Sequence, residues 1–333
     1  MFSLRWFQTI SGIKEGLLIM KDHRSKAGFL LYILLMLFIV SCSNRKKSSN
    51  TVADSPRNGT INISVDESFE PVISEQIKVY ESSYPGTKIN ASYKSEADCF
   101  RDLQSDSTRM IIVARGLTQS ESSFYEAKLS FEPQFGVLAY DAVSVILNMK
   151  AKDSVYTVKQ LKSMLNGKDT SLIVVVDGKN ATSTVRYLLD SVLNGEQFGK
   201  NVMAAEGSKA VVDYISKNDN AIGFVGSSWV TNDQDPEQKA YQQKIRFALI
   251  ECTKNCDTGS FAKPSQATIT YDQYPLVRPL YYVLKENWNG LGTGFSNFLN
   301  LERGQLVFKR SYLVPAKMYF GVRTGNIQTE KNP

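Results

Sequence analysis

Short apolar runs alternate with longer amphipathic stretches from Thr60 to the end of the chain. The runs with strand-like patterns are 60–65, 88–93, 110–114, 136–148, 172–176 and 274–284, the last of which is interrupted by prolines. The stretches with helical spacing are 69–84, 96–105, 158–165, 185–193, 208–217 and 294–307. Strands that alternate with helices predict an α/β fold with largely parallel strands, in which loops and helix starts gather along one edge of the sheet.

The length of the chain predicts two lobes. About 290 residues follow the apolar segment near the N-terminus, which is more than one small domain usually needs. The run 136–148 is long enough to be an extended strand that crosses between lobes. The expected organisation is a signal peptide at 1–41, a flexible tether at 42–59, lobe I at 60–141 plus 273–322, lobe II at 142–272 and a flexible tail at 323–333.

The N-terminal region has the pattern of a secretory signal. Basic residues precede the uncharged apolar stretch 28–40, which is too short to cross a bilayer comfortably. Cys42 follows this stretch after a small residue, which indicates a lipoprotein whose acylated Cys42 anchors it on the periplasmic side of a bacterial membrane. Met20 is then the better natural start. The alternatives are an uncleaved membrane anchor and a chance cysteine.

Composition excludes several classes of function. The chain is 42% hydrophobic and 22% charged, as folded domains are, and its net charge of +6 includes the basic signal region. Beyond Lys47 there is no Lys/Arg block of the kind that binds nucleic acid, so we expect no nucleic-acid partner. The only histidine, His23, lies in the predicted signal, which excludes histidine-dependent nucleophiles and histidine zinc sites. An enzyme that uses Ser68 or Ser183 would lack a histidine base, so we expect no enzyme, no metal and no cofactor.

Three cysteines remain in the predicted mature chain. Cys99, Cys252 and Cys256 are too few for a four-cysteine metal site. In an oxidising compartment Cys252 and Cys256 can close a short disulfide loop or stay reduced, because geometry decides the outcome. Cys99 is expected to be a small buried residue.

Five short motifs occur in a characteristic order: Ser68-Phe69, Tyr93-Lys-Ser95, Val176-Asp-Gly, Asn220-Ala-Ile-Gly-Phe-Val225 and Tyr274-Pro-Leu. In this order the chain resembles the PstS-like phosphate-binding proteins of ABC transporters, a branch of the type II periplasmic binding proteins, over roughly residues 60 to 315. The resemblance implies two α/β lobes joined by crossing strands, with an oxyanion held between them. It also implies a monomer that delivers phosphate to an ABC permease. We keep as the alternative a sensor or binding lipoprotein with a degenerate or different oxyanion site that is not coupled to transport.

The resemblance also implies which residues contact the anion. Hydroxyls and backbone N–H groups at helix N-termini bind oxyanions without a permanent counter-charge. The implied ligand contacts are Ser68, Phe69, Ser95, Arg115, Lys179, Asn180, Thr182, Ser183 and Thr184. Ordinary helix capping is the alternative for the serines and threonines.

The chain departs from the family pattern at two places. Arg115 stands near the position of an aspartate that accepts a proton from the ligand in many phosphate binders. It either pairs with the oxyanion or is a solvated loop residue. The family's arginine before the hydroxyl motif is also missing, and Arg115 and Lys179 are the candidates to replace it.

Overall fold

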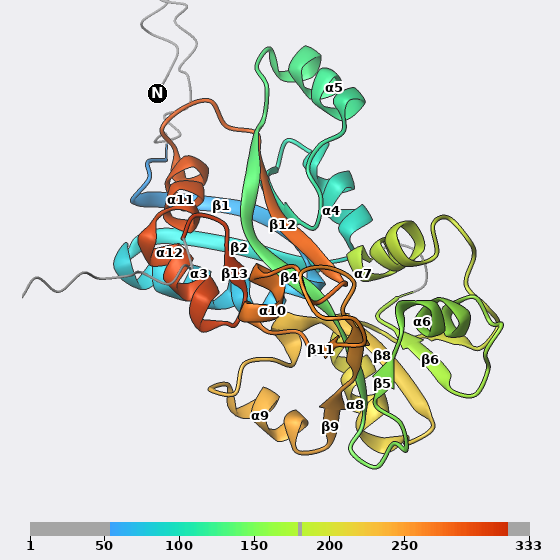
Figure 1. The fold of residues 1–333 in the computed structure, drawn as a ribbon. Helices are drawn as coiled ribbons and strands as arrows, with labels where there is room; N and C mark the ends of the chain where they lie inside the picture. Colours follow the sequence, from blue (N-terminus) through green and yellow to red (C-terminus); the bar gives the residue numbers. More distant parts are fainter. Residues whose placement is uncertain (1–53, 179–181, 319–333) are drawn as a thin grey trace, which may run out of the picture. The chain divides into compact units, whose positions relative to one another are not determined.

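A ten-stranded mixed sheet forms the centre of the protein, which a computed structural model describes for residues 54–178 and 182–318. The main path of the sheet runs through β2 (Gly86–Lys94), β1 (Asn58–Asp66), β3 (Thr108–Val113), β12 (Val277–Leu284), β4 (Gln134–Asn148), β8 (Ala221–Gly226), β6 (Ile173–Val176) and β7 (Val202–Ala204). The chain crosses between parallel neighbours through helices, so the predicted α/β class is confirmed (Figure 1).

The long strand β4 belongs to both parts of the sheet. Its first part pairs with β12 in antiparallel register up to Ala142, and its second part pairs with β8 from Val143 onwards. Two further strands, β9 (Ile245–Phe247) and β13 (Val314–Pro315), also pair with β4. The partner of β4 changes between Ala142 and Val143, one residue after the border at 141/142 that the sequence predicts between lobes I and II, and we keep these names for the two parts.

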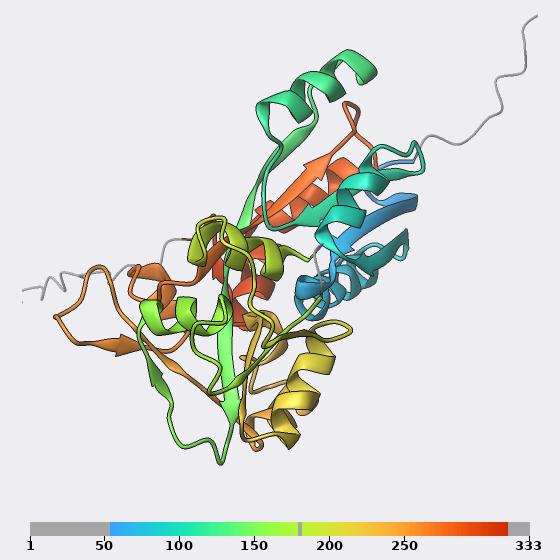
Figure 2. The same ribbon diagram turned by 90° about the vertical axis from the view of Figure 1, so that its right-hand side faces the viewer.

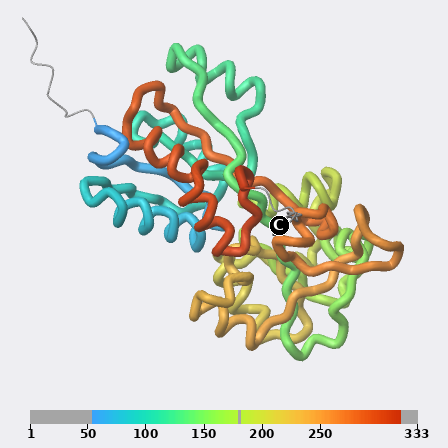
Figure 3. The backbone as a smooth tube through the Cα atoms, turned by 60° about the vertical axis from the view of Figure 1, so that its left-hand side comes forward, coloured from blue at the N-terminus to red at the C-terminus, as the bar shows by residue number. Residues whose placement is uncertain are grey.

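The core of lobe I lies between the parallel strands β1, β2 and β3 and the helices that cover them. Buried aliphatic residues of β1, such as Ile63 and Val65, pack with Phe295 and Phe308 from the end of the chain. The helices are α3 (Glu70–Ser83), α4 (Glu96–Leu103), α5 (Gln119–Leu129), α11 (Leu291–Asn300) and α12 (Glu302–Arg310). Figure 3 shows the red C-terminal helices beside the blue N-terminal strand, so lobe I is built from both ends of the described chain.

Lobe II has its own core around β6 and β8. Apolar side chains of these strands, including Val174 and Phe224, are fully buried. The covering helices are α6 (Val158–Leu165), α7 (Ser183–Tyr187), α8 (Ser208–Lys217), α9 (Pro236–Gln242) and α10 (Gln266–Thr270). Helix α7 continues into a π-helical turn, Leu188–Val192, so the predicted helix 185–193 is present in two forms.

Two features differ from the predicted elements. The stretch predicted as one helix at 294–307 is two helices, because Leu301 has an extended backbone (φ −97°, ψ 173°). Gly304 makes the turn possible, since a Cβ there would lie 2.3 Å from the carbonyl oxygen of Phe298. Helix α5 was not predicted, and a capping box of Thr118 and Glu121 begins it. Figure 2 shows α5 beyond the other helices of lobe I.

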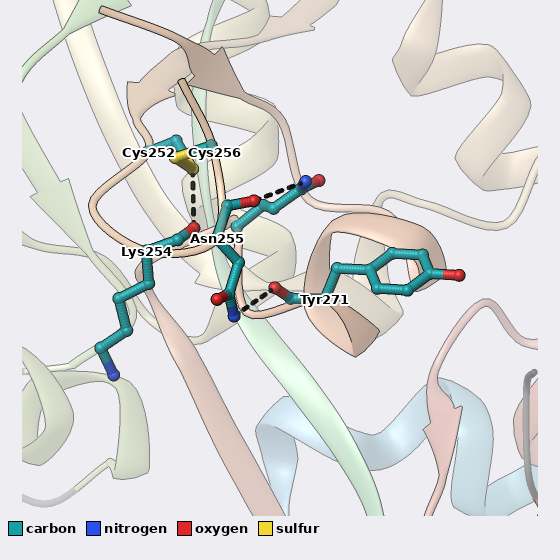
Figure 4. The surroundings of a disulfide bond; sticks show 6 residues. Cys252, Lys254, Asn255, Cys256 and Tyr271 are labelled. Carbon is teal, nitrogen blue, oxygen red and sulfur yellow. Dashed lines mark hydrogen bonds between the residues drawn. A yellow bond between two sulfur atoms is a disulfide. The ribbon is translucent and has the colours of Figure 1, made fainter. Parts of the chain in front are cut away.

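A small second sheet carries a disulfide. Its strands are β11 (Phe261–Ala262), β10 (Leu249–Glu251) and β5 (Val155–Tyr156). Cys252 and Cys256 are bonded directly after β10, with their Cα atoms 6.4 Å apart (Figure 4). Cys99 is a free, fully buried thiol in α4. Among the helices of the described residues, none is both long and apolar enough to cross a bilayer.

Candidate functional site

The first part of the site is the turn that follows β1. Strand β1 ends at Asp66, and a 3-10 turn, η1 (Glu67–Phe69), leads into α3. The carboxylate of Asp66 accepts a hydrogen bond from the backbone N–H of Ser68 at 3.0 Å. Ser68 and Phe69 are both fully buried. The Ser68 hydroxyl makes no side-chain cap for α3, so the capping alternative does not describe it.

The second part of the site is the N-terminus of α7 in lobe II. Thr182 is the N-cap residue, since its hydroxyl accepts from the backbone N–H of Val185 at 3.2 Å and donates to Asp177 Oδ1 at 2.6 Å. Ser183 and Thr184 have no exposed surface. Their buried hydroxyls are not used as caps and are available for other contacts.

The hydroxyls of the two lobes meet. Ser68 Oγ lies 3.4 Å from Ser183 Oγ, 3.4 Å from Thr184 Oγ1 and 3.5 Å from Asp177 Oδ2. Ser68 is more than 100 positions away from the other three residues in the chain, and the sequence motifs alone grouped Ser68, Ser183 and Thr184 as ligand contacts. The structure therefore brings Ser68, Ser183 and Thr184 together, with Thr182 beside them.

Arg278 is a member of this cluster that the sequence reasoning missed. It is 1% exposed, and its Nη1 donates to Ser183 Oγ at 2.8 Å and to Thr184 Oγ1 at 3.2 Å. Its Nε and Nη2 donate to Asp141 Oδ2 at 3.1 and 3.0 Å. Phe69 packs against the guanidinium, with 4.9 Å between the ring centroid and the central carbon. The available signal was a single cation inside the apolar strand β12.

Three buried carboxylates surround the one guanidinium. Asp66, Asp141 and Asp177 are at most 2% exposed. Burial raises the pKa of Asp66 to about 7, with repulsion from Glu96 adding to the effect, and burial also raises the pKa of Asp141 and of Asp177. Burial opposes the charge of Arg278, but the nearby carboxylates, Asp141 first, outweigh it and raise the pKa of the guanidinium. The cluster therefore combines one cation with three carboxylates whose charged forms are disfavoured by burial.

Two predicted contacts, Ser95 and Arg115, are bonded to partners outside this cluster. Ser95 caps α4: its hydroxyl accepts from the backbone N–H of Asp98 at 3.2 Å and donates to Asp98 Oδ2 at 2.7 Å. Arg115 forms a bidentate ion pair with Glu121, in which Nη1 and Nη2 donate to Oε2 and Oε1 at 2.7 and 2.9 Å. Arg278, rather than Arg115, is the guanidinium beside the hydroxyls. Lys179, Asn180 and the lipidation candidate Cys42 lie outside the described residues.

Two further contacts join the lobes around the cluster. Glu96 of α4 accepts hydrogen bonds from Arg186 of α7 at 2.5 and 3.2 Å. Glu67 of η1 accepts from the backbone N–H of Ser208 at 2.5 Å and from its hydroxyl at 2.9 Å, at the start of α8. Sequence reasoning gave neither pair. Within 54–178 and 182–318, no three His, Cys, Asp or Glu side chains form a group that could hold a metal ion.

Proteins named phosphate-binding protein PstS are similar to this chain in sequence. The phosphate-binding protein PstS of Staphylococcus epidermidis is 22% identical over 266 residues, which cover 75% of this chain and 77% of that protein. PstS of Staphylococcus aureus strain USA300 is also 22% identical, over 75% of this chain and 76% of its own length. The resemblance to PstS-like proteins that the five motifs indicate is therefore confirmed.

Solved structures share the fold. A putative phosphate ABC transporter substrate-binding protein from Clostridium perfringens, solved with bound phosphate, aligns with a TM-score of 0.63 and 19% identity, over 78% of this chain and all of that one. An ABC-type phosphate transport receptor from Vibrio cholerae aligns with a TM-score of 0.56 and 17% identity, over 76% of this chain and 99% of the other. The PBP superfamily domain model matches residues 50–302, which is most of the sequence. The chain belongs to the PBP superfamily and has its two-lobed α/β fold.

Proposed function

We propose that this protein is a lipid-anchored, extracytoplasmic solute-binding protein that captures inorganic phosphate between its lobes for an ABC importer. The observation that carries the proposal is the meeting of buried hydroxyls from both lobes, Ser68 on one side and Ser183 and Thr184 on the other, beside one buried guanidinium. Similarity to phosphate-binding proteins in sequence and fold supports the choice of phosphate.

The chemistry of the cluster suits a tetrahedral oxyanion. Hydroxyl and N–H donors at the start of a helix bind anions through directed hydrogen bonds, which allow release as well as capture. The neighbouring carboxylates can accept hydrogen bonds from a ligand that carries protons, as phosphate does at neutral pH, whereas they repel a fully ionised anion such as sulfate. The second feature favours oxyanions that carry protons, phosphate and arsenate among them, over sulfate.

Calorimetry with an oxyanion panel tests the proposal. Protein that lacks residues 1–42 is titrated with phosphate, arsenate, sulfate and molybdate, and we expect heat of binding with phosphate. Thr184→Ala should weaken phosphate binding by about 10–100-fold, because one hydrogen bond to a charged ligand is worth roughly 1.5–3 kcal/mol. Thr157→Ala is the control, since Thr157 caps α6 elsewhere in lobe II. The absence of heat with all four anions would contradict the proposed function.

Lipid anchoring and coupling to a transporter need separate tests. Labelling of growing cells with a radioactive fatty acid should mark the full chain and not a Cys42→Ala variant. An adjacent ABC permease and ATPase in the genome would support transport over the alternative of a sensor that binds the same anion. Phosphate binding without such neighbours would favour the sensor.

A further inference from the structure

Arg278 lies where the chain crosses between the lobes. It is the second residue of β12, directly after the crossing back into lobe I, and its partner in the sheet register is Asp141, the last residue of lobe I before the outward crossing. From this position the guanidinium reaches the hydroxyls of α7 in lobe II and the ring of Phe69 in lobe I. A single side chain thus contacts both lobes at their junction.

The packing around Arg278 fixes its orientation. Asp141 accepts hydrogen bonds from Nε and Nη2, which holds one edge of the guanidinium. Gly226 lies beside Nη2 on this same edge, where an added Cβ would lie 2.8 Å from Arg278 Nη2 and 3.0 Å from the carbonyl oxygen of Ser68. Gly226 therefore provides the space that the guanidinium occupies, and Nη1 is directed towards Ser183 and Thr184.

The direction of these hydrogen bonds determines what the hydroxyls can do. A guanidinium has only donors, so Ser183 Oγ and Thr184 Oγ1 must accept from Arg278. A hydroxyl that accepts in this way keeps its own hydrogen for another partner. In the structure these partners are carboxylates, since the Ser183 side chain is hydrogen-bonded to Asp66 and the Thr184 side chain to Asp177. Both hydroxyls are thus donors, and an oxyanion that enters can replace the carboxylates as the acceptor.

We propose that Arg278, held by Asp141, supplies the positive charge of the oxyanion site and orients the hydroxyl hydrogens of Ser183 and Thr184 towards the ligand. The inference rests on the proposed function. Arg278 replaces, from a different strand, the arginine that the sequence lacks before its hydroxyl motif. Asp141 is a positioning residue, since it acts on the ligand through Arg278.

The charges of the cluster explain why an oxyanion site here needs the positive charge of Arg278. Asp66, Asp141 and Asp177 are buried carboxylates near the hydroxyls, and each raises the energy of an anion that enters. Arg278 is the cation that the described residues bring into hydrogen-bond contact with Ser183 and Thr184. Without it, hydroxyl donors alone would have to offset this repulsion.

Two substitutions separate this role from simple packing. Arg278→Gln removes the charge, and we expect phosphate affinity to fall by at least about 100-fold, as truncation of a buried charged contact does. Asp141→Asn keeps an oxygen that accepts from Arg278 but removes a repelling negative charge, so phosphate affinity should rise by roughly 2–10-fold. Both variants should lower the melting temperature, because each breaks a buried ion pair.

A purely structural pair would give a different result. If the Arg278–Asp141 pair only stabilised the fold, Arg278→Gln and Asp141→Asn would weaken phosphate binding to a similar extent. That outcome would overturn the inference. Because Arg278→Gln can also fail to fold, Arg278→Lys is measured beside it. Lysine keeps the charge but cannot bond to Asp141 and both hydroxyls at once, so we expect about tenfold weaker binding. Wild-type affinity in Arg278→Lys would contradict the orienting role.

A double-mutant cycle with Ser183→Ala tests the path through the hydroxyls. If Arg278 acts through Ser183, the loss in the double variant with Arg278→Lys should be smaller than the product of the two single losses. Independent losses would contradict this part of the inference. Wild-type protein that binds none of the four oxyanions would contradict the proposed function and the inference together, whereas wild-type binding with an unaffected Arg278→Gln would contradict the inference alone.

Discussion

Arg115 and Glu121 form an ion pair that is complete without a ligand. Both guanidinium nitrogens of Arg115 that face Glu121 are bonded to it, and the central carbon of Arg115 lies 3.7 Å from the Phe100 ring centroid. The hydrogen bond from Arg115 is the main cause that lowers the pKa of Glu121, to about 2. Arg115 thus has its own partner in the loop between β3 and α5.

We therefore expect Arg115→Gln to keep phosphate affinity within about twofold of wild type. The melting temperature should fall slightly, since a partly exposed ion pair contributes about 1 kcal/mol or less. Calorimetry and thermal unfolding measure the two effects on one sample. A tenfold or greater loss of affinity would instead make Arg115 a ligand contact, as its position in the sequence suggests.

Glu67 gives the protein a pH-dependent stability. Burial raises its pKa to about 7, with repulsion from Asp177 as the next cause, compared with an ordinary value of 4.5. The folded protein therefore binds this proton more tightly than the unfolded chain does. The resulting stabilisation is fully present below about pH 4.5 and is lost as the pH rises through 7. Asp66 acts in the same direction, because its pKa is also raised to about 7.

The free energy of unfolding should consequently fall between pH 5 and pH 8. In Glu67→Gln part of this slope should disappear, on the order of 1 kcal/mol across the window, because glutamine does not titrate but still accepts from the N–H of Ser208. Urea unfolding at several pH values measures the slope. The expectation fails if stability rises with pH in this window or if the variant keeps the wild-type slope.

At the residue scale, the sequence motifs identified hydroxyl residues that meet in the cluster, but they did not identify its cation, Arg278. Ser68 and Ser183 each follow a strand, where residues of parallel sheets gather at one edge, so their meeting could be anticipated. Arg278 could not, because its site depends on the pairing of β12 with β4, between residues 137 positions apart. The register of β12 against β4 places Arg278 opposite Asp141, and apolar periodicity in the sequence does not reveal strand register.

At the scale of elements, the disulfide loop holds the chain just before β12. Asn255 donates from its amide to the carbonyl oxygen of Tyr271, and Gln273 donates to the carbonyl oxygen of Asn255, both at 3.1 Å (Figure 4). Lys254 pairs with Asp272 at 3.2 Å. The loop between Cys252 and Cys256 therefore braces the turn that leads towards Arg278.

Replacing both cysteines with serine should destabilise the protein modestly. A loop this short limits the entropic gain to about 2 kcal/mol, which corresponds to a drop in melting temperature of roughly 2–6 °C. Phosphate affinity should change by no more than about threefold. Thiol titration provides the check on the bond: denatured protein without residues 1–42 should show one thiol before reduction and three afterwards. Three thiols before reduction would contradict the bond.

Element boundaries were predictable where periodicity was uninterrupted. Helices α6 and α8 begin and end at the predicted residues, because apolar spacing and flanking turn residues agree there. The break between α11 and α12 was not predicted. Leu301 is a good helix former in sequence, and tertiary packing at Gly304 overrides that propensity.

At the scale of the whole molecule, direct contacts between side chains hold the two lobes together. Hydroxyl oxygens of opposite lobes lie 3.4 Å apart, which leaves no room for an oxyanion between them. Capture therefore requires the lobes to separate and close again around the ligand. A contact that exists only when the lobes are closed should then contribute to affinity, because ligand binding and closure are linked.

The Glu96–Arg186 ion pair is the contact best suited to test this linkage. Glu96 is 4% exposed and Arg186 is 32% exposed in their side chains, so the pair is partly shielded from water. Glu96→Gln keeps an acceptor for the backbone N–H of Ala114 but removes the charge. We expect phosphate to bind about 5–30-fold more weakly, as loss of roughly 1–2 kcal/mol of closure energy implies, mainly through faster dissociation.

The matched control is Glu121→Gln, which breaks the ion pair with Arg115 inside lobe I and should leave the dissociation rate unchanged. Stopped-flow fluorescence gives the rates and calorimetry the affinities. Equal affinity in wild type and Glu96→Gln would show that the pair does not contribute to closure around the ligand. A higher affinity in Glu96→Gln would mean that the pair holds the lobes shut against the ligand, and closure would then compete with capture instead of assisting it.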